Sequence, residues 1–331
     1  MILGTWGAAW GAYYGGVWAG LLAAIAFGAL GGLLHAVATV TFNVNHIVSG
    51  VAINLLGLGV AKYLANLVFK PISGNPRQSP VVPKFDTYSA AGLADWLKDL
   101  EDQQRVGISD VAGILRGLVT EVAPLTVLAL ALVPISYYIL WRTRFGLRVR
   151  SCGENPHAAE SLGVNVYRHK YLAVLISGGF AGMGGASLVL LKGGADYLEG
   201  QTNGRGFIGL AAMIFGNWRP GGLLGGAALF GYSDGLQLAG GGKAVLALLY
   251  GAVLLVGVIV IVQLIRRKWF AAALALVAAG VLYAIYWTQD TLPSDLIPYT
   301  AHFVTLIVLA VASQRLRPPR ADGMPYRRGE D

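Results

Sequence analysis

Long apolar stretches recur along the chain and alternate with short polar segments. A helix needs roughly 20 residues to cross a hydrocarbon core about 30 Å thick. The apolar stretches of about this length are, in chain order, Gly16–Thr41, His46–Phe69, Leu118–Leu140, Tyr171–Leu191, Gly221–Ala239, Ala244–Ile265, Trp269–Trp287 and Leu296–Ser313, with the shorter Phe207–Gly216 among them. Met1–Ala12 is too short to span. The pattern predicts an all-α, polytopic membrane protein of about nine transmembrane segments plus an N-terminal partial helix, with a membrane domain over residues 1–313 and a tail over 314–331.

The segment 70–117 interrupts the apolar pattern and is predicted to be an external loop. Four prolines open it, and Leu93, Trp96, Leu97 and Leu100 then recur at helical spacing among charged residues, as in a short amphipathic helix. Such a helix is either a platform for a partner at the membrane surface or a helix that rests in the membrane interface. The sequence alone does not separate these two interpretations.

Composition and charge place the chain in a membrane rather than in water. Of 331 residues 55% are apolar and 13% are charged, about half of the roughly 25% charged residues usual in soluble domains. The net charge of +8 is segregated by loop, which indicates membrane topology and not nucleic-acid binding. Fifteen of the 25 basic residues and five of the 17 acidic ones lie on one side if that side carries the loop 142–170, Arg219, the run 266–268 and the tail from Gln314. That side is therefore predicted to be cytoplasmic, with the C-terminus inside.

The chemistry-bearing residue types do not form a metal or nucleotide site. Cys152 is the single cysteine, and the five histidines lack the spacing of zinc ligands, so no metal or cofactor is expected in this chain. Gly204–Gly209 matches G-x-G-x-x-G and Gly231–Gly235 matches G-x-S-x-G, but neither follows a predicted strand, as these motifs require. The sequence has no phosphate-binding P-loop motif, so energy for any transport has to come from a partner or a gradient.

Glycines at a spacing of four predict close helix packing. Small residues at this spacing let two helices approach in lipid, and three pairs have it: Gly28 with Gly32, Gly178 with Gly182, and Gly221 with Gly225.

Polar residues within or next to the apolar stretches form a candidate substrate path, because polar groups in hydrocarbon are costly and usually face a cavity or a partner helix. The candidates are Asn43, Asn45, Ser49, Asn54, Glu121, Asp234 and Gln237. For each of them a helix–helix hydrogen bond is the alternative to a substrate contact. Glu121, three residues before Pro124, has the further alternative of a position at the membrane edge.

The basic loop 142–170 contains a short, well-delimited helix. Asn155 is a good N-cap, Pro156 suits the first helical position, and Gly163 is placed to end the helix. An inert positive-inside loop would need basic residues but no such boundaries. The pattern therefore favours a docking element between two spans.

These residues resemble those of a known transporter family. The run Gly153–Val164, GENPHAAESLGV, resembles the coupling loop of permease subunits in ABC importers of the ribose, branched-chain amino acid and nucleoside type. The run Gly204–Trp218 followed by Pro220, the segment Asn45–Leu56 and the tail Pro318–Gly329 are similar to the nucleoside branch. The resemblance covers nearly the whole chain.

The resemblance implies a permease subunit of the cytoplasmic membrane that imports nucleosides by alternating access. It implies an ABC ATPase subunit that binds the ATP, a second related permease in a heterodimer, an external substrate-binding lipoprotein, and no nucleic-acid partner. The residues that it assigns to coupling with the ATPase are Glu154, Asn155, Pro156, Ala158, Ala159 and Gly163.

Two departures from the family pattern accompany the resemblance. A span ending in N-I-G-x-E-G-M usually lies upstream of the position of Met1, and the uncharged opening favours a late start over a lost span. The segment Gly240–Trp287 adds two spans, which preserves the topology. The rival interpretations are a sugar or branched-chain amino acid permease of the same architecture, a gradient-driven secondary transporter, and an intramembrane hydrolase that uses Ser233.

Overall fold

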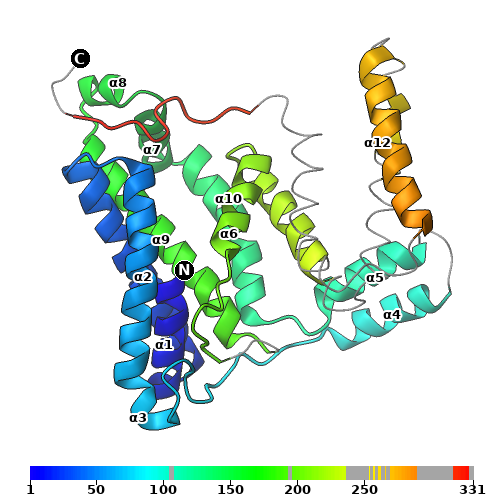
Figure 1. Cartoon of the computed structure of the whole chain (residues 1–331), viewed down its shortest axis with the longest axis horizontal. Coiled ribbons are helices and arrows are strands. Elements are labelled where there is room, and N and C mark those ends of the chain that lie inside the picture. Colours follow the sequence, from blue (N-terminus) through cyan, green and yellow to red (C-terminus); the bar gives the residue numbers. More distant parts are fainter. Residues whose placement is uncertain are drawn as a thin grey trace. The chain divides into compact units, whose positions relative to one another are not determined.

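The computed structural model of the chain describes residues 1–103, 108–192, 196–235, 269–288 and 316–327, and single positions between 253 and 265. These residues are mostly helical and contain two isolated β-bridges but no strand, which confirms the all-α prediction for the described part of the chain (Figure 1). The chain divides into two compact units. The first comprises Met1–Gly206 with Pro319–Asp331, and the second comprises Phe207–Pro318.

The helices of the first unit include both long apolar helices and short connecting ones. They are α1 (Ile2–Ala36), continued by a π-helical turn (Val37–Thr41), α2 (His46–Val68), α3 (Lys70–Ser73), α4 (Ala91–Asp102), α5 (Ile108–Val119), α6 (Pro124–Arg142), α7 (Arg144–Glu154), α8 (Pro156–Ser161) and α9 (Val166–Leu190). Helix α10 (Arg205–Phe215) begins at the boundary, and the second unit also contains a helix over 220–235 and α12 (Trp269–Thr288).

Helix α1 reverses its direction at Gly16. This residue has φ 80° and ψ −179°, a conformation that glycine adopts without steric cost. The Trp6 ring lies 5.2 Å from the Phe27 ring, whereas 21 residues of straight helix would separate them by about 30 Å. The segment before Gly16 is thus a partial helix that packs antiparallel on the segment after it, and the span itself begins beyond Gly16.

Glycines bring α1 and α9 into backbone contact and form the centre of the first unit. A Cβ atom on Gly28 would lie 2.6 Å from the Cα of Gly182, and one on Gly178 would lie 2.6 Å from the carbonyl oxygen of Gly28. Close approach of this kind needs residues without side chains. The predicted role of the first two glycine pairs is confirmed.

The third glycine pair does not pack within the described residues. Gly221 and Gly225 face open space there, whereas Gly222 and Gly226 lie against Gly216 and Ala212. The helix over 220–235 therefore packs on α10 through the neighbouring face, and the role of Gly221 and Gly225 stays a prediction.

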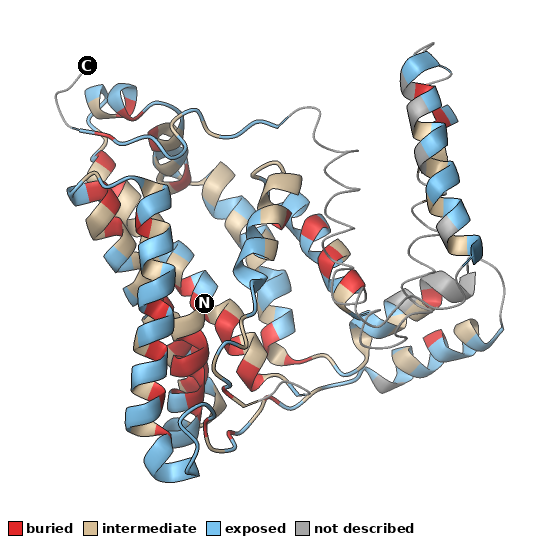
Figure 2. Cartoon of the chain, in the orientation of Figure 1, coloured by how far each residue is buried: buried red, intermediate tan, exposed pale blue. Residues whose placement is uncertain are grey.

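Four described helices are long and apolar enough to cross a membrane: Ile2–Thr41, which includes the reversal at Gly16, His46–Val68, Pro124–Arg142 and Val166–Leu190. Exposed side chains follow the outward faces of α2 and α6 (Figure 2), and many of them are large and apolar, such as Val51, Leu55 and Val127. Water does not tolerate apolar faces of this extent. The chain is a multi-pass membrane protein.

One predicted span begins too early. The prediction placed a span over Leu118–Leu140, but the residues up to Val119 belong to α5. The chain is extended before α6, where Tyr88 and Val122 form a β-bridge, and Pro124 then occupies the first turn of the helix. The count of about nine segments stays a prediction, because most of Ala244–Ile265 and all of Leu296–Ser313 lie outside the described residues.

The predicted amphipathic helix is present as α4, and α5 pairs with it as a second helix that the sequence interpretation did not identify. Leu97 is buried at 3%, whereas Trp96 is exposed. Arg116 of α5 and Glu101 of α4 form an ion pair with an N–O distance of 2.9 Å. The segment 70–117 thus contains two paired helices in its second half.

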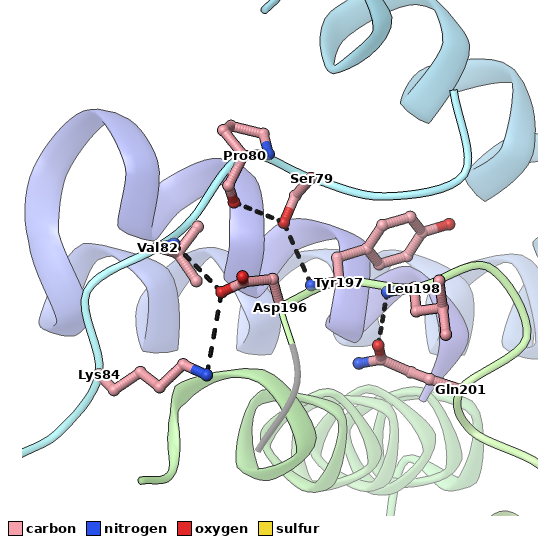
Figure 3. Close-up of polar contacts among 8 residues, drawn as sticks. All are labelled: Ser79, Pro80, Val82, Lys84, Asp196, Tyr197, Leu198 and Gln201. Atoms are coloured by element: carbon pink, nitrogen blue, oxygen red, sulfur yellow. Dashed lines mark hydrogen bonds and ion pairs between the residues drawn. The ribbon is translucent and has the colours of Figure 1, made fainter. Parts of the chain in front are cut away.

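Two loops, around residues 79–84 and 196–201, contact each other at one end of the first unit. This is the end where α1 reverses, and we call it the Gly16 end. Figure 3 shows Asp196 between the backbone N–H of Val82 and the Lys84 ammonium, at 3.2 Å and 3.9 Å. The hydroxyl oxygen of Ser79 accepts the Tyr197 N–H at 3.1 Å. Tyr197 is 2% exposed, and this burial raises the pKa of its phenol to about 12. These hydrogen bonds and the ion pair connect the two loops without regular secondary structure.

Candidate functional site

The site lies at the opposite end of the first unit, where α7 crosses the end of α6. The Thr143 hydroxyl accepts the Gly146 N–H at 3.1 Å and caps α7. A Cβ atom on Gly146 would lie 2.5 Å from the Cα of Leu140, so the corner admits no side chain. The Nε–H of Arg150 donates to the Leu140 carbonyl at 3.0 Å, and its guanidinium lies 5.3 Å from the Trp141 ring centre. Helices α6 and α7 therefore form a rigid elbow.

Helix α8 is closed at both ends by its own sequence. The Asn155 side chain accepts the Ala158 N–H at 3.0 Å, and Pro156 occupies the first turn. Gly163 has φ 79°, and the Val164 N–H donates to the Ala159 carbonyl at 3.0 Å, which is the hydrogen bond of a Schellman C-cap. All three predicted boundary residues are confirmed in these conformational roles.

Exposure divides the candidate coupling residues into two groups. Glu154, Asn155, Ala158 and Gly163 are exposed, whereas Pro156 and Ala159 are buried. Ala159 is 2% exposed and cannot be touched by a partner in this arrangement. Ala159 lies on the buried face of α8, where it packs in the cluster that holds the helix.

The exposed face of α8 ends in a residue that the sequence interpretation missed. The Leu162 side chain is 84% exposed, although it lies on a polar loop outside the apolar helices. Together with exposed Ala158, it gives the solvent-facing side of α8 an apolar character. Its position at the C-cap of a delimited helix was the available signal.

Beneath α8 lies a small apolar cluster that the chain's tail completes. Cys152, Ala159, Val166 and Tyr326 are all buried. Burial raises the pKa of the Cys152 thiol, so the reactive thiolate is disfavoured there. Residue Tyr326 reaches this cluster from the segment after the last predicted span, and the sequence offered no pattern that placed it there.

The loop after α8 leads directly into a span. The Asn165 side chain accepts the Arg168 N–H at 3.0 Å and caps α9. Three residues, Gly163, Val164 and Asn165, thus separate the exposed Leu162 from the first residue of α9. The chain thus connects α8 to α6 through α7 on one side and directly to α9 on the other.

Three candidates for the substrate path lie at the same end as α8. The Asn45 side chain accepts the N–H groups of Ile47 and Val48 and caps α2. Asn43 has φ 52° in the turn before it. Ser49 is buried, and its hydroxyl shares a hydrogen bond of 3.0 Å with His35 Nδ1. The Ser49–His35 bond joins α2 to α1 and is the helix–helix hydrogen bond considered as an alternative from the sequence. Asn45 instead caps its own helix.

The other path candidates are dispersed. Asn54 is exposed along α2. Glu121 has φ 52°, and its N–H donates to the Ser89 hydroxyl in the turn before α6; its position at a membrane edge stays a prediction. Asp234 lies near the end of the described helix 220–235, in the second unit. Gln237 lies outside the described residues.

The motifs Gly204–Gly209 and Gly231–Gly235 have the helical surroundings that their sequence context indicated. Gly204 has φ 75° and α10 begins at Arg205, with no preceding strand in the described part. The Ser233 hydroxyl donates to the Leu229 carbonyl one turn earlier, a common arrangement for a serine within a helix. The residues that the structure describes hold no group of three or more histidine, cysteine or acidic side chains arranged for a metal ion.

Comparison with known proteins identifies close sequence relatives. The profile of the family described as "Branched-chain amino acid transport system / permease component" matches residues 1–263. The chain is 39% identical over 221 residues to the guanosine ABC transporter permease protein NupQ of Bacillus subtilis, which covers 66% of this chain and 62% of that protein.

Two further relatives carry related names. The nucleoside ABC transporter permease protein NupC of Lactococcus lactis is 36% identical over 66% of this chain and 63% of its own length. The putative glucose ABC transporter permease protein TsgC13 of Haloferax volcanii is 35% identical over 65% of this chain and 58% of its own length. The chain thus matches about three fifths of the length of these relatives. No solved structure matches the chain.

Proposed function

This chain belongs to the family of branched-chain amino acid transport system permease components, and from that membership we propose that it is the membrane-spanning permease subunit of an ATP-driven nucleoside importer. The observation that carries the substrate class is the 39% identity to a guanosine permease, with a second nucleoside permease at 36%. The relatives extend beyond the matched region, so the substrate and partners of the whole assembly belong to this proposal.

In the proposed assembly a separate ATPase subunit binds α8. The capped helix offers exposed Ala158 and Leu162 to that partner, while buried Pro156 and Ala159 hold the helix on the permease. Glu154, Asn155 and Gly163 complete the coupling site. ATP-driven closure of the ATPase would move α8, and the elbow at Gly146 would pass the movement to α6.

The topology of the proposal follows from charge. The end that carries α7, α8 and the tail holds the basic loop 142–170, and the positive-inside rule places such a loop in the cytoplasm. The C-terminus then lies inside the cell, and the loops of the Gly16 end face the external substrate-binding lipoprotein. A second, related permease would complete the substrate path, to which Asn54 and Asp234 remain candidates.

A sugar is the second candidate substrate. The chain is 35% identical to a putative glucose permease over 65% of its length, only slightly less than to the nucleoside permeases. Amide side chains along a path suit the hydroxyl groups of a ribose and of a free sugar alike.

The decisive experiment measures uptake of labelled guanosine in source cells with and without this gene. Unlabelled adenosine, uridine, glucose, ribose and leucine are added in turn as competitors. Gene-dependent uptake that only nucleosides inhibit supports the proposal, and uptake inhibited by glucose or ribose replaces it with the sugar importer. Uptake that survives ATP depletion but collapses with the ion gradient would overturn the ATP-driven mechanism.

A control variant addresses the hydrolase alternative in the same assay. Because the Ser233 hydroxyl is engaged by the Leu229 carbonyl, Ser233→Ala should leave guanosine uptake unchanged. Lost hydrolysis of a peptide or ester substrate in that variant, with no change in uptake, would instead reveal an enzyme.

A further inference from the structure

The tail segment 319–327 lies on α7 and α8 and is held there by its backbone. The Ala321 N–H donates to the Gly153 carbonyl at 2.9 Å, and the Arg320 N–H donates to Glu154 Oε2 at 3.4 Å. A Cβ atom on Gly153 would lie 3.6 Å from the Cβ of Pro319. The tail therefore follows the last turn of α7 at contact distance.

Tyr326 fixes the far part of this tail segment beneath α8. Its side chain is 4% exposed, and its hydroxyl donates to Glu160 Oε2. The ring centre lies 5.1 Å from that of His157 and 5.5 Å from that of Tyr167, and the Lys170 ammonium lies 5.3 Å from it. One side chain thus contacts both α8 and the first turn of α9.

The same tail segment also reaches the turn between α1 and α2. With its amide oriented to satisfy both neighbours, the Asn43 side chain donates to the Tyr326 carbonyl at 3.2 Å and accepts the Arg327 Nε–H at 3.1 Å. The left-handed backbone of Asn43, with φ 52°, presents this amide to the tail. Asn43 therefore serves as an anchor for the tail in this structure.

Helix α8 needs support of this kind. It has six residues, far fewer than the roughly 12–15 that an isolated helix needs to be even marginally stable in water. The cluster beneath it consists of four buried residues, of which three are small or medium-sized, namely Cys152, Ala159 and Val166, and Tyr326 is the largest. The tail thus supplies the largest buried side chain of the cluster on which α8 rests.

We propose that the tail segment 319–327 is a structural part of the coupling element, and that Tyr326 is the positioning residue that holds α8 in register with α9 and α2. The proposal rests on the proposed function, because it concerns how movement of α8 drives transport. It adds a second chain segment, more than 150 residues away in sequence, to the short capped loop.

The first test uses the single cysteine as a reporter in the full-length protein in membranes. Cys152 lies in the cluster that Tyr326 covers, so maleimide labelling should be slow in the unaltered chain. Tyr326→Ala should raise the labelling rate by at least about tenfold, because removing a buried aromatic ring is among the costliest core substitutions. Tyr326→Phe keeps the ring and should stay close to the unaltered rate. Met324→Ala, at an exposed position of the same tail, is the matched control and should change nothing.

The second test separates positioning from simple stability. The complete transporter, reconstituted with its ATPase, is assayed for substrate imported per ATP hydrolysed. We expect Tyr326→Ala to lower this ratio severalfold at equal membrane insertion, and Tyr326→Phe to restore most of it. Equal ratios for Tyr326→Ala and the unaltered chain, or unchanged labelling of Cys152, would overturn the proposal. Absence of any import by the unaltered complex would instead contradict the proposed function.

A cross-link keeps the proposal testable if Tyr326→Ala fails to insert. Gly153→Cys with Pro319→Cys, in a Cys152→Ser background, places two Cβ atoms 3.6 Å apart, within the roughly 3.5–4.5 Å of natural disulfides. Rapid disulfide formation with retained import supports a tail that stays docked throughout transport. No cross-link under oxidising conditions, or loss of import once it has formed and recovery on reduction, would refute a permanently docked tail.

Discussion

Alanine at Gly178 should separate the two central helices of the first unit. A Cβ atom there would lie 2.6 Å from the Gly28 carbonyl oxygen, 3.0 Å from the Gly32 Cα and 3.1 Å from its nitrogen. All three neighbours are backbone atoms, which cannot rotate away. Because non-bonded heavy atoms settle at about 3.5 Å or more, α1 and α9 would have to move apart by almost 1 Å along their contact.

The size of the effect follows from this displacement. Extra atoms forced into a packed interior lower the free energy of unfolding by about 1–3 kcal/mol. Here the lost stability is that of the packing between α1 and α9. Gly184, six residues further along α9, offers a matched control, because a Cβ atom there meets nothing within 4 Å. Gly184→Ala should be neutral or stabilising by up to about 1 kcal/mol through helix propensity.

The assay is thermal denaturation of the full-length protein in mild detergent, with the remaining folded protein measured by fluorescence-detected size-exclusion chromatography. Gly178→Ala should melt several degrees below the unaltered protein, and Gly184→Ala should melt at or above it. If Gly178→Ala is as stable as Gly184→Ala, the glycines do not set the distance between α1 and α9, and the reasoning is refuted.

Three further predictions concern the loops. Asn155→Ala removes the cap on the Ala158 N–H and should cost about 1 kcal/mol, measured as faster amide exchange in α8; Asn155→Asp keeps an acceptor and should restore protection. Gly163→Ala places a Cβ at φ 79°, which costs about 1–2 kcal/mol, and should lower import per ATP more than Gly163→Asn, since asparagine tolerates this conformation. Asp196→Ala removes the acceptor of the Val82 N–H and should accelerate proteolysis of the loops at the Gly16 end, whereas no change in cleavage would show that the loops are held by packing alone.

Local rules predicted the features whose determinants are adjacent in sequence. A capped helix is predicted within nine residues by Asn155, Pro156 and Gly163. The structure contains this helix with the expected hydrogen bonds. The spacing of Gly28 and Gly178 within their own helices likewise revealed which faces pack, because a face of small residues has few other uses in lipid.

Features that depend on contacts between distant segments could not be predicted from local sequence patterns. Tyr326 is one aromatic residue in a polar tail, and no local pattern links it to α8, more than 150 residues earlier. Asn45 and Ser49 were attributed to a possible path because polar groups near apolar helices are costly, yet a cap and a side-chain hydrogen bond satisfy them here equally well. The hydropathy pattern also placed the end of α5 and most of α6 in one predicted span, because hydropathy does not detect the extended residues between the two helices.

The tight corner at Gly146 determines what kind of motion the permease can make. Helix α7 has 11 residues and is therefore a rod of about 16 Å, with α8 at its free end and α6 fixed across the other. A shift of about 3 Å at α8 would turn such a rod by roughly 10°. Because this corner is too tightly packed to admit a side chain, we expect α7 and α6 to rotate together, so that a movement of α8 would displace the opposite end of α6.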